Sequence, residues 1–158
     1  MAANGLMYTA SFDNISITAA AQDIWEFVCG AAAAVLIHSF RLTIVPTITS
    51  GVAQDVRAQF RQLVRSTTGS GGTAVTPRAV NPRNTVAAAV TTTRMVTTPG
   101  TAGNVWSADQ PSIIVPYERI FTPDQRILVP ASTRWCLNLE ASLGGAFNAS
   151  SEVYFEEV

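Results

Sequence analysis

The pattern of hydrophobic and polar positions along the chain is typical of β-strands. Its clearest segment is Arg134 to Leu143, in which Trp135, Leu137 and Leu139 alternate with polar residues. An alternation of period two predicts a strand with one face on a core and the other in water.

A second alternating segment runs from Leu36 to Val45 and is followed by Pro46, which cannot donate to a sheet ladder. One face of this predicted strand carries the chain's single histidine among apolar residues: Leu36, His38, Phe40, Leu42 and Ile44. We therefore expect His38 to be a core or interface residue.

Shorter apolar or β-branched runs predict further strands, many of them separated by Pro, Gly, Asn or Asp. These runs are Tyr8 to Phe12, Ile15 to Ala19, Asp23 to Val28, Thr85 to Val96, Ile113 to Phe121, Arg126 to Val129 and Glu152 to Phe155. Many short strands divided by turns predict an all-β fold, a single β-sandwich or jelly-roll-like domain spanning 1–158.

The segment Val52 to Arg65 fits two patterns. Val52, Val56 and Phe60 fall at helical spacing, whereas Val56, Ala58 and Phe60 alternate with polar residues as in a strand. No good N-cap precedes the segment, and the other predictions are all β, so a strand is favoured over a helix.

Two long stretches, 66–84 and 97–111, are rich in Gly, Pro, Ser and Thr and predict long projecting loops. They also carry Val75, Val80 and Trp106, which are too apolar for simple flexible linkers. We expect these loops to contact neighbouring subunits, with a mobile surface loop as the alternative for the first stretch.

The composition excludes several classes of protein. The chain has 158 residues, of which 47% are hydrophobic and 13% charged, with a net charge of −1. This balance argues against a disordered chain and against a nucleic-acid binder. The longest apolar run is too short to span a bilayer and no signal peptide opens the chain, so we expect a soluble protein with no membrane partner.

All ten cationic residues are Arg. The planar guanidinium suits interfacial pairs, although a GC-rich genome would also explain the bias. Arg57, Arg61 and Arg65 form a row that predicts either a solvated face or a surface that meets an acidic partner, since only Asp55 is close to them in sequence.

Residues for catalysis are sparse. His38 has no accompanying nucleophile motif, and Cys29 and Cys136 have no metal-like or redox-like spacing. Cys29 shares a face with Trp25 and Phe27, which predicts a buried thiol, whereas Cys136 lies on the polar face of its strand. We expect no enzyme activity, no catalytic residue, no metal and no cofactor.

Four segments carry a resemblance to a known family. They are MYTASFDNISITAAAQDIWEFV, VLIHSFRLTI, FRQLVRSTTGSGGTAVTPRAVNP and SSEVYFEEV. Together they resemble the cement, or capsid-decoration, proteins of tailed-phage heads. The run Ala31 to Ala34 departs from the resemblance, since a more polar turn is expected there.

The resemblance implies a structural virion protein of the outer capsid surface, made in the host cytoplasm. Its implied partners are the phage major capsid protein and further copies of itself in a homotrimer, and it implies no catalytic residues. The candidate interface residues are Arg57, Arg61, Arg65, Val75, Val80 and Trp106. The alternative function is a carbohydrate- or receptor-binding sandwich of a phage fibre or head appendage, for which only Trp106 and Tyr117 are available as exposed aromatics.

Overall fold

The computed structural model describes residues 5–17, 21–46, 58–140, 143 and 147–158. Within these ranges the protein is all β, and its one helical element is the short 3-10 turn η1 (Pro123–Gln125). The strands are β1 (Leu6–Ile17), β2 (Gln22–Val28), β3 (Val35–Pro46), β4 (Phe60–Arg65), β5 (Thr73–Val75), β6 (Arg78–Ala79), β7 (Thr91–Val96), β8 (Ala102–Asp109), β9 (Tyr117–Ile120), β10 (Ile127–Val129), β11 (Arg134–Leu139) and β12 (Phe147–Glu157).

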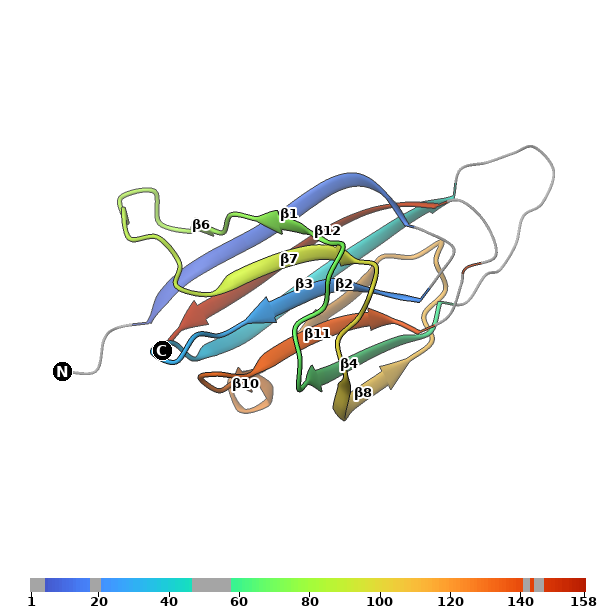
Figure 1. Ribbon diagram of the computed structural model, residues 1–158. Coiled ribbons are helices and arrows are strands. Elements are labelled where there is room, and N and C mark those ends of the chain that lie inside the picture. Colours follow the sequence, from blue (N-terminus) through green and yellow to red (C-terminus); the bar gives the residue numbers. More distant parts are fainter. Residues whose placement is uncertain (1–4, 18–20, 47–57, 141–142, 144–146) are drawn as a thin grey trace.

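The strands form two antiparallel six-stranded sheets that pack face to face (Figure 1). Sheet A has the order β10-β3-β12-β1-β6, and β9 also pairs with β3. Sheet B has the order β5-β7-β2-β11-β4-β8. The prediction of an all-β sandwich is therefore confirmed, while its jelly-roll detail stays a prediction.

Aromatic side chains from both sheets fill the space between them. Phe27 and Trp135 of sheet B meet Phe155 and Phe40 of sheet A, with 5.2 Å between the ring centroids of Phe27 and Phe155, and Trp25 of sheet B packs against Phe27. Each of these rings is almost completely buried. Aromatic side chains bury large apolar areas, so this cluster dominates the stability of the sandwich.

The alternation predicted for Arg134 to Leu143 is confirmed as far as Leu139, where β11 ends. The apolar side of β11 faces the core as expected. The polar side is buried as well, since Cys136 and Asn138 are almost inaccessible to solvent. The outer face of sheet B must therefore be covered by other parts of the chain.

The face predicted for His38 is wrong. On the neighbouring strand β12, the consecutive residues Tyr154 and Phe155 pair with Ser39 and Ile37 of β3. His38 between them has no partner in this register and forms a β-bulge. A bulge of this kind reverses which face the following side chains occupy. Consequently Ile37 is buried before the bulge and Phe40 after it, whereas His38 is only partly buried.

Within the described part of the 52–65 segment, Phe60–Arg65 form a strand, β4, as favoured over a helix. Residues 52–57 lie outside the described residues. Two other predicted strands are shorter than expected, because β7 occupies only the end of 85–96 and β9 only part of 113–121.

The loop predicted for 97–111 is largely wrong. Most of this stretch is β8, the edge strand of sheet B, which pairs with β4 through two register shifts. Nearly all residues of β8 are exposed, and a strand exposed on both faces has no apolar alternation to reveal it. The stretch 66–84 contains the short strands β5 and β6 between its loops.

Candidate interaction surfaces

The predicted arginine row does not form a free basic face. Arg61 pairs with Glu140, and Arg65 is buried against Asp23. Arg57 lies outside the described residues. Antiparallel pairing brings these acids beside β4 from β2 and from the end of β11, which the spacing in sequence cannot indicate. Arg65 is therefore too buried to meet a partner, whereas Arg61 is partly exposed but already has an intramolecular partner, and its interface role stays a prediction.

A polar cluster lies buried on the outer face of sheet B. Arg65 donates to both carboxylate oxygens of Asp23, at 2.6 and 2.7 Å, and Asn138 donates to Asp23 at 2.8 Å. Asp23 is 0% exposed and Arg65 6% exposed. Burial lowers the pKa of Arg65, but the hydrogen bond and charge of Asp23 outweigh it and raise the pKa overall. The Arg65 guanidinium therefore stays charged although it is buried.

Two loops of the same chain cover this cluster. They run from β4 to β5 and from β7 to β8, and both cross the outside of sheet B (Figure 1). The amide N–H of Gly69 donates to Glu26 at 3.0 Å, and Arg65 donates to the carbonyl oxygen of Gly100 at 2.6 Å. A bridge between Ser70 and Thr98 joins the two loops.

The glycine run at 69–72 allows this close packing. A Cβ atom on Gly69 would lie 2.4 Å from the Val96 side chain, and one on Gly72 would lie 2.9 Å from the carbonyl oxygen of Arg94. Glycine is the residue that permits such an approach of backbone to sheet. The first part of the 66–84 stretch is thus held by its own chain.

Both cysteines are buried free thiols. Burial, together with the charge of Glu157, raises the pKa of Cys29 to about 11. Burial likewise raises the pKa of Cys136, helped by the nearby charges of Asp23 and Glu26. A nucleophilic cysteine needs a lowered pKa, so neither environment activates a thiol.

His38 lies beside Glu156, with 3.1 Å between His38 Nε2 and a carboxylate oxygen. Both side chains are partly buried, on neighbouring strands β3 and β12. No group of three or more metal-ligating side chains lies together in the described ranges. The described elements also include no helix that is long and apolar enough to cross a membrane.

One end of the sandwich exposes small and medium apolar side chains, and we call it the apolar end. It is formed by the β2–β3 connection, by the segment before β7 and by the C-terminus. Backbone hydrogen bonds join Ala34 to Val158, and Glu157 accepts from the backbone N–H groups of Ala89 and Val90. Its exposed apolar residues are Ala31, Ala32, Val80, Val86, Ala87, Ala89 and Val158.

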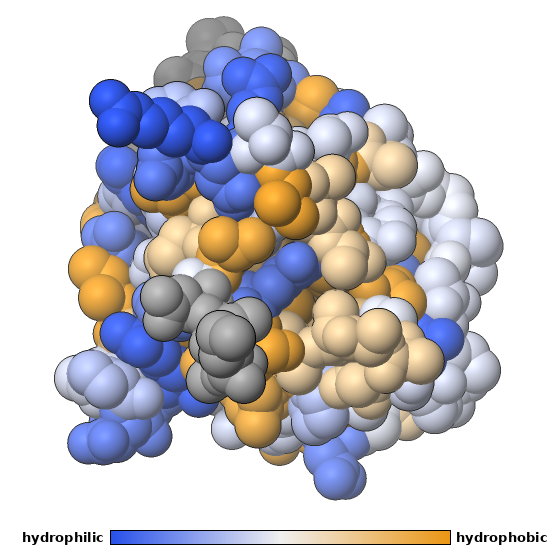
Figure 2. Space-filling model, turned by 90° about the vertical axis from the view of Figure 1, so that its left-hand side faces the viewer, coloured by the Kyte–Doolittle hydropathy of each residue, from blue (hydrophilic) through white to orange (hydrophobic). Residues whose placement is uncertain are grey.

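Figure 2 shows this end, with hydrophobic side chains gathered across its middle. The Val86 side chain is 57% exposed and the Val158 side chain 52% exposed, so both lie on the surface and not at the partly buried margin of the hydrophobic core. Val80, predicted as an interface residue, belongs to this end and is exposed, whereas Val75 is partly buried against the core. The sequence signal for the apolar end was the alanine run at 31–34.

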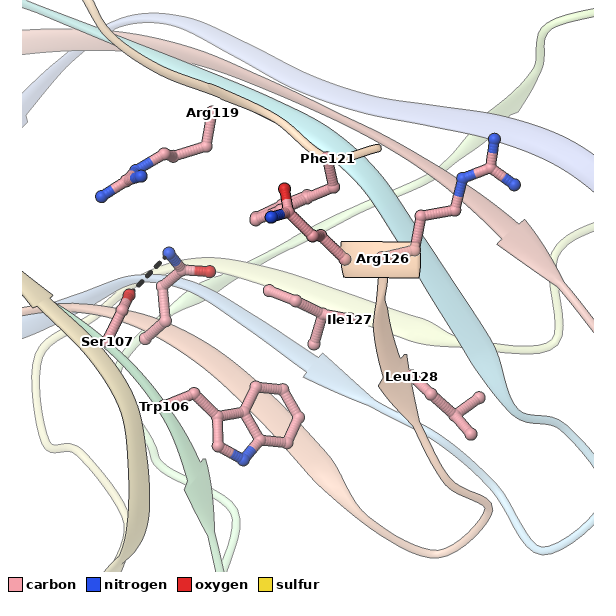
Figure 3. Close-up of a pocket in the computed structure, with 9 residues that line it drawn as sticks. Trp106, Ser107, Arg119, Phe121, Arg126, Ile127 and Leu128 are labelled. Carbon is pink, nitrogen blue, oxygen red and sulfur yellow. Dashed lines mark hydrogen bonds between the residues drawn. The ribbon is translucent and has the colours of Figure 1, made fainter. Parts of the chain in front are cut away.

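A groove of about 320 Å³ lies where the edges of the two sheets meet, and we call it the Trp106 groove. Sheet B contributes β4 and β8, and the opposite wall comes from β9, η1 and β10. Its lining residues are Gln62, Trp106, Ser107, Arg119, Phe121, Gln125, Arg126, Ile127 and Leu128 (Figure 3).

The groove combines an aromatic face with buried polar atoms. Trp106 is 42% exposed, the only one of the three tryptophans that is not fully buried. Gln62 is almost completely buried, and its Nε2 donates to Ser107 at 2.8 Å. Gln62 Oε1 and Arg126 Nε are buried and have no hydrogen-bond partner within the described residues. Buried polar atoms without partners are uncommon in folded proteins.

Charge in the groove is largely compensated. Arg119 pairs with Asp109, which also accepts a hydrogen bond from Tyr117 at 2.7 Å. Burial, together with this hydrogen bond, raises the pKa of Tyr117 to about 12. The Tyr117 ring stacks on Phe60, so the expectation that it is an exposed aromatic is wrong.

The Trp106 groove was missed from the sequence, although Trp106 itself was singled out. Gln62, Phe121 and Ile127 reach the groove from three separated segments, and nothing in their spacing indicates a common site. Comparison of the chain with protein-family models, with curated proteins and with solved structures finds no match in any of the three.

Proposed function

We propose that the protein is a structural virion protein that decorates a phage capsid and bridges its major capsid subunits. The proposal starts from the resemblance to head-decoration proteins and from the apolar end. It assigns the apolar end to contact with the capsid shell.

The observation that carries the proposal is the exposure of Ala31 and Ala32 at the tip of a strand connection. Such tips are normally polar, because Gly, Asn, Asp and Ser satisfy turn geometry and remain hydrated. The same connection is hydrogen-bonded to the C-terminus through Ala34 and Val158, and Val158 and Val86 are themselves exposed apolar residues. Contiguous apolar patches on a soluble protein mark sites of contact with other proteins.

Small side chains suit a flat, repeated contact. Burial of apolar surface contributes roughly 25 cal/mol per Å², and alanine loses almost no side-chain entropy when it is buried. Each contact is then weak, and attachment gains its strength from several copies acting together. A homotrimer, which the resemblance implies, supplies such multivalency.

Capsid sedimentation tests the proposal. Labelled protein is mixed with expanded capsids that lack it, and the fraction that sediments with them is measured. We expect Ala32→Glu and Val86→Glu to abolish co-sedimentation, because each places a charge in the buried contact. Ala74→Glu, at an exposed position of β5, is the matched control and should sediment like the parent.

Light scattering on the same proteins reports the oligomeric state. If the two apolar-end variants attach like the parent, the apolar end is not the capsid contact and the proposal fails. Circular dichroism of each variant confirms that the sheet structure is retained.

A further inference from the structure

We propose that the Trp106 groove binds a neutral saccharide, with one sugar ring stacked on the indole of Trp106. This inference concerns a different surface from the apolar end and does not depend on capsid attachment. A groove of about 320 Å³ falls at the small end of ligand sites, which corresponds to a monosaccharide or disaccharide.

The partly exposed indole supplies the stacking surface. The C–H groups on one face of a pyranose ring are apolar and carry partial positive charge, whereas an aromatic face is negative. Trp106 lines the groove beside Ile127 and Leu128, which extend the apolar floor (Figure 3). The remaining hydroxyl groups of the ring then lie toward the polar wall.

The unpartnered oxygen of Gln62 selects a hydroxyl group. Gln62 Oε1 has no hydrogen-bond donor within the described residues, and a sugar hydroxyl group supplies one. An apolar side chain of a partner protein would supply no donor and would leave Gln62 Oε1 without a hydrogen bond, whereas a sugar hydroxyl group satisfies it. A saccharide therefore fits the groove better than an apolar peptide side chain.

The geometry of β8 also disfavours a peptide added as an extra strand. The pairing of β8 with β4 is interrupted by two register shifts. Bulged edge strands are poor templates for regular strand addition. Binding of a peptide along β8 is therefore the alternative that the experiment below distinguishes from saccharide binding.

The charges of the groove point to a neutral ligand. The Arg119 guanidinium is already paired with Asp109. The Arg126 guanidinium points away from Trp106 (Figure 3), so the two cationic groups do not converge on one acidic substituent. An acidic sugar would find no free cation beside the ring.

Titration of the isolated full-length protein tests the proposal. The probes are glucose, galactose, N-acetylglucosamine, cellobiose and lactose, with glucuronate as the acidic comparison. Trp25 and Trp135 are fully buried, so acrylamide quenching of fluorescence reports mainly on Trp106. We expect at least one neutral probe to protect Trp106 from quenching in a saturable way and to bind more tightly than glucuronate.

Variants identify the site, with binding measured by saturation-transfer NMR on the saccharide protons. We expect Trp106→Ala to weaken binding at least about tenfold and Trp106→Phe to retain part of it. Gln62→Met, which keeps the length of the side chain and removes the acceptor, should weaken binding with the stacking intact. Val105→Ala, the neighbouring exposed residue of β8, is the matched control.

Three results would overturn the proposal. The first is that no neutral probe binds saturably, and the second is that the Trp106→Ala protein binds as the parent does. The third is that Trp106→Ala disrupts oligomers or capsid attachment while no saccharide binds, which would assign the groove to a protein segment. Because the titrations contain no capsids, a failure here leaves the proposed capsid contact untouched.

Discussion

Arg65 forms a two-pronged ion pair with Asp23, which lies 42 residues away in the sequence. Both side chains are buried from solvent, and the Asn138 side chain donates a further hydrogen bond to the Asp23 carboxylate. Because both charges have lost their hydration, each depends on the other.

Asp23→Asn should therefore destabilise the fold strongly. The substitution leaves the Arg65 guanidinium buried without its counter-charge, and removal of one partner from such a pair costs about 3–5 kcal/mol. Urea denaturation followed by circular dichroism measures the loss. Glu140→Gln breaks the much more exposed pair with Arg61 and should cost less than about 1 kcal/mol. Equal losses in the two variants would contradict this interpretation of the cluster.

Glu26 should make stability depend on pH. Burial raises its folded-state pKa above the ordinary value of 4.5, although the Gly69 N–H opposes this. Between 4.5 and the raised value, the folded protein keeps a proton that the unfolded chain releases, so the free energy of unfolding falls as pH rises through this window. Above the raised pKa the loss is complete.

Glu26→Gln should remove this decline, because a neutral amide keeps the acceptor for Gly69 and does not titrate. The measurement is the free energy of unfolding of parent and variant as a function of pH. Glu118→Gln, the same charge change at an exposed carboxylate, is the matched control. Parallel curves for the parent and Glu26→Gln would show that Glu26 does not contribute.

Gly69→Ala should loosen the loop that covers the cluster. The added methyl group would lie 2.4 Å from the Val96 side chain and 2.9 Å from the carbonyl oxygen of Thr98. Overpacking of this kind costs about 1–3 kcal/mol. Gly30→Ala meets nothing within 4 Å and should change stability by less than about 1 kcal/mol. Thermal denaturation compares the two variants. The prediction fails if Gly69→Ala has the same melting temperature as Gly30→Ala.

The two thiols should be unreactive in the folded protein. Cys29 and Cys136 are both buried, and burial raises both pKa values, that of Cys29 to about 11. We expect a thiol-reactive chromogenic disulfide at mildly alkaline pH to label neither cysteine until denaturant is added, and then to label both. Rapid labelling of either cysteine in the folded state would contradict the packing around it.

Local pattern was enough to predict the class of the fold and part of its core. The alternation around Trp135 and the burial of Cys29 follow from side chains that alternate between the two faces of a strand, which is a property of consecutive residues. The same reasoning favoured a strand within 52–65, of which Phe60–Arg65 is present as β4.

Only the tertiary structure decided which residues meet. The bulge at His38 depends on the register with β12, and the acids beside Arg61 and Arg65 come from strands that are remote in sequence. The edge strand β8 has no apolar alternation because it is exposed on both faces. Sequence periodicity reports the environment of each strand separately, whereas strand pairing and the closure of loops over a sheet are set by contacts between distant segments. The Trp106 groove and the buried polar cluster both arise from such contacts, so they could be found only once the sheets were assembled.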